Sequence, residues 1–178
     1  TGTQEYNGST TFSSANLVIT GVNGQTFSVA GAAQMLAKNV QVNQQLQDVS
    51  GLVLTGNSGA LLSNYNPLSI ANTSISITPK SVTITAPNVS KTYDASAVYN
   101  ASSADLIAMA TPLVGGDSVT SASTQFTTVT AGSNKTLQLL SVVINDGNNG
   151  NNYSVTLQNS TNNTINKATL TVAAANDG

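Results

Sequence analysis

The chain has no cysteine, histidine, tryptophan or arginine. Without cysteine it forms no disulfide and no thiolate metal site, and without histidine it has no imidazole for base catalysis or metal binding. Only 7% of the 178 residues are charged, against ~25% in an average globular protein. Five lysines cannot build the basic stripe that phosphate recognition needs, so we expect no nucleic-acid partner.

Acidic residues are few and dispersed along the chain. They are Glu5, Asp48, Asp94, Asp105, Asp117, Asp146 and Asp177. They are nowhere clustered, no serine has a base near it, and no glycine-rich loop opens a helix to hold phosphate. We therefore predict a protein that is not an enzyme and has no catalytic residue, cofactor or metal. The stretch "NDGNNG" (145–150) comes nearest to a Ca²⁺ loop, but it offers a single acid, and we interpret it as a turn.

The chain is instead rich in asparagine, serine, threonine and glutamine, and 39% of its residues are hydrophobic. Hydrophobic residues in alternating segments and a net charge of only −2 argue against disorder. No hydrophobic run approaches the ~18 residues of a membrane-spanning helix, so we expect no membrane insertion. The chain starts without methionine and shows no signal peptide, so we expect a fragment of a longer protein.

Segments of the first half of the chain recur in the same order in the second half, and we call this repetition the sequence echo. The segment "TQEYNGSTTFS" (3–13) returns as "SKTYDASAVYN" (90–100), which places Tyr6 opposite Tyr93. Four more pairs follow in the same order: "LVITGVNGQTF" (17–27) with "LIAMATPLVGGDSV" (106–119), "AQMLAKNVQVNQQL" (33–46) with "TQFTTVTAGSNKTL" (124–137), "SNYNPLSI" (63–70) with "NNYSVTLQ" (151–158), and "ISITPKSVTI" (75–84) with "NTINKATLTV" (163–172). The offset drifts between about 87 and 92 residues. This predicts two repeats, residues 1–84 and 85–178.

Each repeat is predicted to consist of short strands and turns. The segments "SISIT" (74–78), "SVTIT" (81–85), "YSVTL" (153–157) and "ATLTV" (168–172) alternate polar and apolar residues. Residues 32–47 alone have a helical composition, but their counterpart, residues 122–139, is rich in β-formers, so we predict strands in both. A short helical turn near residues 33–38 is left open. The predicted fold is all-β: two tandem small β-sandwich-like domains, immunoglobulin-like or β-grasp-like, elongated end to end.

The joint between the repeats is the strand "SVTIT" (81–85), which lies between Pro79 and Pro87. Each proline restricts the residue before it, so we expect a short, semi-rigid connection. Either this strand closes the first repeat, or "ATLTV" (168–172) is the first strand of a third one. We expect the former.

Five motifs in fixed order resemble a known family. They are "ITPKSVTI" (77–84), "KTYDAS" (91–96), "LVGGDSVT" (113–120), "NKT" (134–136) and "GNNYSVTL" (150–157). They resemble the YDG repeats, which occur with MBG ("mostly β, glycine-rich") repeats in very large exported bacterial adhesins, including haemagglutinin-like exoproteins of two-partner secretion. The name-giving Tyr-Asp-Gly is Tyr93-Asp94-Ala95 in the second copy and Tyr6-Asn7-Gly8 in the first. The resemblance implies stacked β domains that project a binding region from a cell surface, hence a secreted or surface location.

Two residue types deserve a functional hypothesis beside a structural one. Tyr6 and Tyr93 are either sugar-stacking platforms or half-buried rings that hold a turn with the help of Asn7 or Asp94, and we favour the structural role. Tyr65 and Tyr153, each after asparagine at a strand entrance, receive the same interpretation. A Lys–Asn isopeptide crosslink is a further hypothesis, for which the lysines are Lys38, Lys80, Lys91, Lys135 and Lys167.

The resemblance implies a mechanical function, and the composition and the repeats are consistent with it. We expect a non-enzymatic stalk or spacer segment of a secreted adhesin, monomeric as a fragment, whose partners are neighbouring repeats of the same chain. The alternative is a module that binds a host or biofilm glycan or protein directly, through an exposed aromatic cluster or apolar patch that we do not expect here. A third hypothesis is self-association of parallel stalks through exposed sheet edges.

Overall fold

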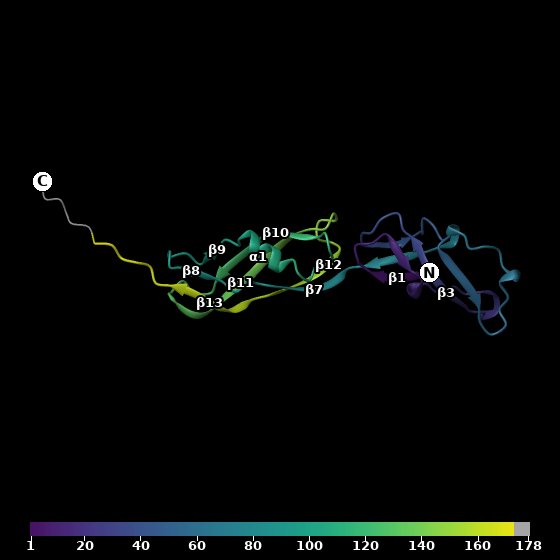
Figure 1. Cartoon of the computed structure of the whole chain (residues 1–178), viewed down its shortest axis with the longest axis horizontal. Coiled ribbons are helices and arrows are strands. Elements are labelled where there is room, and N and C mark those ends of the chain that lie inside the picture. The colour runs from purple at the N-terminus through teal and green to yellow at the C-terminus, as the bar shows by residue number, and fades with distance from the viewer. Residues whose placement is uncertain (173–178) are drawn as a thin grey trace. The chain divides into compact units, whose positions relative to one another are not determined.

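The computed structural model describes residues 1–172 and is mostly β, with 46% strand and one short helix (Figure 1). The chain forms two compact units. Unit 1 comprises Thr1–Ser81, Val114–Gly116 and Asp146–Ser154, and unit 2 comprises Val82–Leu113, Asp117–Asn145 and the residues from Val155 on. Two short segments from the second half of the sequence therefore belong to unit 1.

The strands of unit 1 are β1 (Gly2–Glu5), β2 (Thr11–Ser13), β3 (Phe27–Gln34), β4 (Gln41–Gln44), β5 (Leu52–Gly56) and β6 (Ile75–Thr78), with 3₁₀ turns η1 (Ser14–Asn16), η2 (Val22–Gly24), η3 (Leu62–Asn64) and η4 (Ile70–Asn72). Unit 2 contains β8 (Ser90–Thr92), β9 (Val98–Tyr99), α1 (Ser103–Met109), β10 (Ser118–Phe126), β11 (Gly132–Asn145) and β13 (Ser160–Asn166). Strands β7 (Lys80–Thr85) and β12 (Tyr153–Gln158) pair with each other, and the division between the units falls within both.

Unit 1 has two small sheets. In one, β6 pairs with β1 in parallel and with β4 in antiparallel orientation. In the other, β3 lies between β2 and β5, antiparallel to both. Alternation along β6 buries Ile75 and Ile77, which pack into a core that also contains Tyr6, Phe12 and Met35.

Unit 2 has one five-stranded sheet in the order β8-β13-β11-β10-β9. Its pairings repeat those of unit 1: β8 is parallel to β13 as β1 is to β6, and β9 is antiparallel to β10 as β2 is to β3. The long strand β11 pairs with β13 through its first part and with β10 through most of its length. In unit 1 two separate strands make the corresponding pairings: β4 pairs with β6, and β5 pairs with β3.

Most of the predicted strands are confirmed. Residues 32–47 contain the end of β3 and β4, residues 122–139 contain the end of β10 and the start of β11, and three of the four alternating segments are β6, β7 and β12. The strand predicted at 168–172 is wrong, because these residues lie outside any strand and Leu170 is 94% exposed. An extended segment becomes a sheet strand only with a neighbour to hydrogen-bond. The strand expected after Tyr65 is also absent, and Pro67 lies in its place.

Helix α1 corrects the expectation of an all-β chain. Ser102 caps the helix, because its Oγ accepts the Asp105 N–H at 3.3 Å while Asp105 Oδ2 accepts the Ser102 N–H at 2.8 Å. This reciprocal pair is a capping box. Its spacing, "SSAD" before "LIAM", was readable in the sequence as a helix start. Met109, at the end of α1, is buried in the core of unit 2.

Candidate functional sites: the tyrosine turns and the asparagine loop

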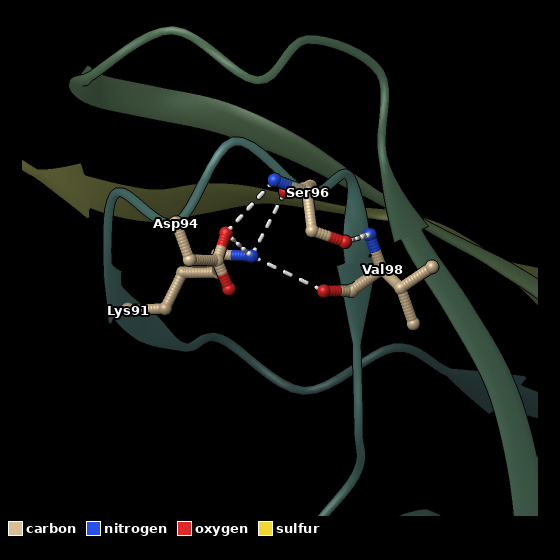
Figure 2. Close-up of polar contacts among 4 residues, drawn as sticks. All are labelled: Lys91, Asp94, Ser96 and Val98. Atoms are coloured by element: carbon tan, nitrogen blue, oxygen red, sulfur yellow. Dashed lines mark hydrogen bonds and ion pairs between the residues drawn. The ribbon is translucent and has the colours of Figure 1, made fainter.

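The segment after β8 forms a tight turn held by side chains (Figure 2). Asp94 Oδ1 accepts the Ser96 N–H at 3.0 Å, and Ser96 Oγ accepts the Val98 N–H at 3.1 Å. Lys91 Nζ donates to the carbonyls of Ser96 and Val98 at 2.9 and 3.1 Å and forms an ion pair with Asp94 at 2.7 Å. One ammonium group therefore ties the strand to both sides of the turn.

The lysine in this turn is largely enclosed. Its side chain is 11% exposed, and Nζ lies 5.9 Å from the centre of the Phe126 ring. The hydrogen bond from Lys91 lowers the pKa of Asp94, with help from the Ser96 main chain. An ammonium group has three N–H donors, and here Asp94 and two carbonyls use them. The Lys91 ammonium group thus holds the turn together through these three contacts.

Unit 1 contains the same turn with uncharged residues. Asn7 Oδ1 accepts the Ser9 N–H at 3.0 Å, and Ser9 Oγ accepts the Thr11 N–H at 2.9 Å. Gln4 stands where unit 2 has Lys91, and its Nε2 donates to the Thr11 carbonyl at 3.2 Å. That carbonyl is the counterpart of the Val98 carbonyl. An amide and an ammonium therefore perform the same structural role in the two units.

A second feature that the two similar halves of the sequence share is a tyrosine hydroxyl bound to a main-chain N–H, and both copies of it lie in unit 1. Tyr65 Oη accepts the Val22 N–H at 3.0 Å, and Tyr153 Oη accepts the Val114 N–H at 2.8 Å. The sequence echo aligns Tyr65 with Tyr153, and Val22 and Val114 lie in its paired segments 17–27 and 106–119. The structural interpretation of both tyrosines is thus supported, since each hydroxyl fixes a glycine-containing turn.

The asparagine-rich loop is an ordered hub of unit 1. Asp146 is buried, and its carboxylate accepts the N–H groups of Asn148, Gly150 and Asn152 at 2.8, 2.9 and 3.1 Å. Burial raises the pKa of Asp146, but these three hydrogen bonds outweigh it and leave the pKa below its usual value. The carboxylate oxygens are therefore occupied by main-chain donors of their own loop.

Asn152 links this loop to residues far away in the sequence. It is fully buried, and its Oδ1 accepts the Val40 N–H at 2.9 Å while its Nδ2 donates to Asn39 Oδ1 at 3.1 Å. It also accepts a hydrogen bond from Asn148 Nδ2 at 2.9 Å and donates to the Asp146 carbonyl at 3.3 Å. The two bonds to Val40 and Asn39 connect this loop from the second half of the sequence to the rest of unit 1. No local pattern indicated this role, because asparagine is common throughout the chain.

The comparison with protein families agrees with these positions. Residues 78–164 match the YDG domain family. They form a YDG domain. The match includes the Lys91 turn, the Tyr153 tie and the Asp146 loop, which are therefore features of the YDG domain in this chain. No curated protein and no solved structure matches the chain.

Tyr6 and Tyr93, the tyrosines of the two segments that resemble the Tyr-Asp-Gly motif, differ in exposure. Tyr93, in the YDG domain, is 42% exposed, whereas Tyr6 is 1% exposed and packs edge to face on Tyr153 at 5.4 Å between ring centres. The expectation of two half-buried rings thus describes neither tyrosine closely. The main chain of the two residues is held alike, because Tyr6 N–H donates to the Thr78 carbonyl and Tyr93 N–H to the Asn166 carbonyl.

In residues 1–172 no three acidic, histidine or cysteine side chains gather as a metal site, and Asp177 lies beyond them. Lys80 pairs with Glu5 at 3.5 Å, and Lys135 donates to the hydroxyls of Thr128 and Thr130. An isopeptide crosslink stays an untested hypothesis. No helix of the described chain is long and apolar enough to cross a membrane.

Proposed function

We propose that the chain is a spacer segment of a secreted bacterial surface adhesin, built from two tandem YDG-type repeats and devoid of enzymatic activity. The observation that carries the proposal is the repetition of one set of strand pairings in two units, together with the YDG domain at residues 78–164, which contains most of unit 2 and short segments of unit 1. A unit that can be repeated along a chain provides length by addition. Residues 1–84 are then a degenerate first repeat, and residues 85–178 a second.

The two turns and the two tyrosine ties support the repeat assignment. Each feature recurs with an equivalent main-chain partner. In the turns the side chain changes from Gln4 to Lys91, whereas in the ties it is tyrosine both times. Side chains that serve their own turn are not available to grip a ligand. The low charge fits a spacer as well, because few surface charges are present for salt to screen.

The test is an adhesion assay in which the chain sets a distance. A binding module of known ligand is displayed on cells through no copy, one copy or two copies of the chain, beneath a polymer layer that hides the module. A Gly/Ser linker with the same number of residues is the control, because it coils and reaches less far on average. We expect capture of ligand-coated beads to increase with each copy and to exceed that of the linker.

Two results would contradict the spacer function. One is bead capture that does not depend on the number of copies. The other is saturable binding of the chain alone to a glycan array or to host cells, competed by free chain, which is the outcome expected of a recognition module. Small-angle scattering adds an independent check, since tandem repeats arranged end to end should scatter as an extended particle.

A further inference from the structure

Unit 1 has an open groove on its surface. Two adjoining hollows of about 710 and 490 Å³ share Ile19, Leu52 and Leu68 in their linings. Leu54, Phe27 and Tyr65 line the larger hollow, and Leu17 lines the smaller one. Of these side chains, all but Leu68 are only half-buried, and Leu68 is exposed. These two hollows are the unit 1 groove.

One border of the groove is the chain segment that follows Tyr65. Residues 66–69 line it, and they lie outside any strand. In unit 2, the chain after the equivalent Tyr153 continues as strand β12, beside β7. The same position in the two repeats therefore has a neighbouring strand in one case and a groove in the other.

Strand β7 shows what fills this position in unit 2. Val82, Ile84 and Ala86 are 7%, 0% and 4% exposed, whereas the residues between them face outward. The Ala86 N–H donates to the Gln158 carbonyl at 2.8 Å, next to β12. An extended segment with an apolar residue at every second position thus completes the core of unit 2.

The segment that follows β13 has the same pattern, and its side chains are exposed. Leu170 and Val172 correspond in the sequence echo to Val82 and Ile84, and they are 94% and 99% exposed. They alternate with Thr169 and Thr171 as the β7 residues alternate with serine and threonine. Two such side chains in water favour burial against an apolar surface.

We propose that the unit 1 groove binds an extended strand with alternating apolar residues, and that this strand is Lys167–Val172 of a second copy of the chain. Leu170 and Val172 enter the groove among Ile19, Leu52 and Leu54, and the strand lies along residues 66–69. Strand addition of this kind combines main-chain hydrogen bonds with pockets for alternate side chains. The groove and the donor segment are different surfaces, so the contact is head to tail and continues from one copy to the next, in an open chain or a closed ring.

The inference goes beyond spacing and does not depend on it. It predicts that copies of the chain join each other, whatever the parent protein does. In a chain of successive repeats the same contact would be made by the preceding repeat, as β7 makes it in unit 2. The failure of one proposal therefore leaves the other standing, because adhesion reach and chain association are measured separately.

The first test is sedimentation velocity of the whole chain over a wide range of concentration. We expect the mean sedimentation coefficient to rise with concentration, and the association constant to fall at least about tenfold in the double variant L170D/V172D. The matched control is T169D/T171D, which places the same charges on the outward face of the same segment and should still associate. A wild-type chain that stays monomeric throughout overturns the proposal. So does association that persists in L170D/V172D, which would indicate sheet edges, and so does an equal loss in both double variants.

The second test is complementation by mixing. Leu68→Asp damages the groove at an exposed loop residue, so folding should be retained, as far-UV circular dichroism would verify. Alone, this variant and L170D/V172D should each be monomeric. Mixed, the intact donor of the first should enter the intact groove of the second and give a one-to-one complex. Absence of that complex, when the wild-type chain associates, would overturn the assignment of donor and groove.

Discussion

Ala95 occupies the third position of the Tyr93 turn, where the YDG motif has glycine. Its φ is 61°, in the left-handed region that costs a residue with a Cβ roughly 1–2 kcal/mol. Glycine removes that strain but makes the unfolded chain more flexible, which costs about 0.4–1 kcal/mol. We expect Ala95→Gly to raise the free energy of unfolding of unit 2 by about 0.5–1 kcal/mol. For a domain of this size the melting temperature should rise by about 2–8 °C.

Differential scanning calorimetry of the whole chain is the assay. The control is Ala131→Gly, since Ala131 is also exposed but does not have a positive φ. This change should lower the melting temperature, because only the unfolded-state term remains. If Ala95→Gly lowers the melting temperature as much as Ala131→Gly does, backbone strain is not stored in this turn, and the reasoning is refuted.

The reciprocal change in unit 1 tests the same reasoning at a more crowded position. Gly8 has a φ of 76°, and a Cβ added there would lie 2.6 Å from Val114 Cγ1. We expect Gly8→Ala to lower the free energy of unfolding of unit 1 by about 1–3 kcal/mol, from strain together with the forced shift of Val114. A neutral effect in urea unfolding would show that unit 1 relaxes around the new methyl group.

Three further tests address the hydrogen bonds of unit 1, each by urea unfolding. Asn152→Ala removes four hydrogen bonds from a buried side chain and should lower the free energy of unfolding by about 2–4 kcal/mol. The control Asn100→Ala, at an exposed asparagine, should change it little. Equal effects of the two substitutions would mean that the Asn152 hydrogen bonds do not stabilise unit 1. Tyr153→Phe leaves the Val114 N–H without its acceptor and should lower the free energy of unfolding by about 1–2 kcal/mol. Tyr65→Phe should lower it less, because water can reach the half-buried Tyr65. The opposite order would contradict this argument from burial. The folded-state pKa of Asp146 lies below the ordinary value of 3.8, so its stabilisation is complete above that pH and is lost as the pH falls through the folded-state pKa. Asp146→Asn should therefore be less stable at neutral pH and lose less on acidification, and an unchanged pH profile would refute this assignment.

The local features of the fold were largely predictable from the sequence. The echo matched Tyr65 with Tyr153 and Asn7 with Asp94, and these residues make equivalent bonds, because short-range geometry follows residue type and spacing. Helix α1 was missed although its capping box was legible. A segment of seven residues is too short to show a clear helical periodicity of apolar residues, so this pattern did not indicate the helix.

Features that depend on distant contacts could not be predicted. The loop at Asp146 belongs to unit 1 through bonds to Asn39 and Val40, more than a hundred residues away, and no local pattern encodes that partner. The unit 1 groove could not be predicted either. Leu52 and Leu54 are half-buried, and how far such residues are buried depends on which strand lies beside them in the fold, not on their own segment. Alternation also predicted a strand at residues 168–172 that is absent, because strand formation requires a partner.

The division of one long strand into β4 and β5 has a practical consequence. Residues 45–51 separate these strands in unit 1, whereas β11 runs without interruption in unit 2, and yet the neighbours are the same. The sheet therefore tolerates extra chain at this point. An epitope or peptide tag inserted into β11 near Leu140, an exposed residue at a register shift, should be displayed without loss of the fold, which makes the YDG domain a scaffold for engineered surface display.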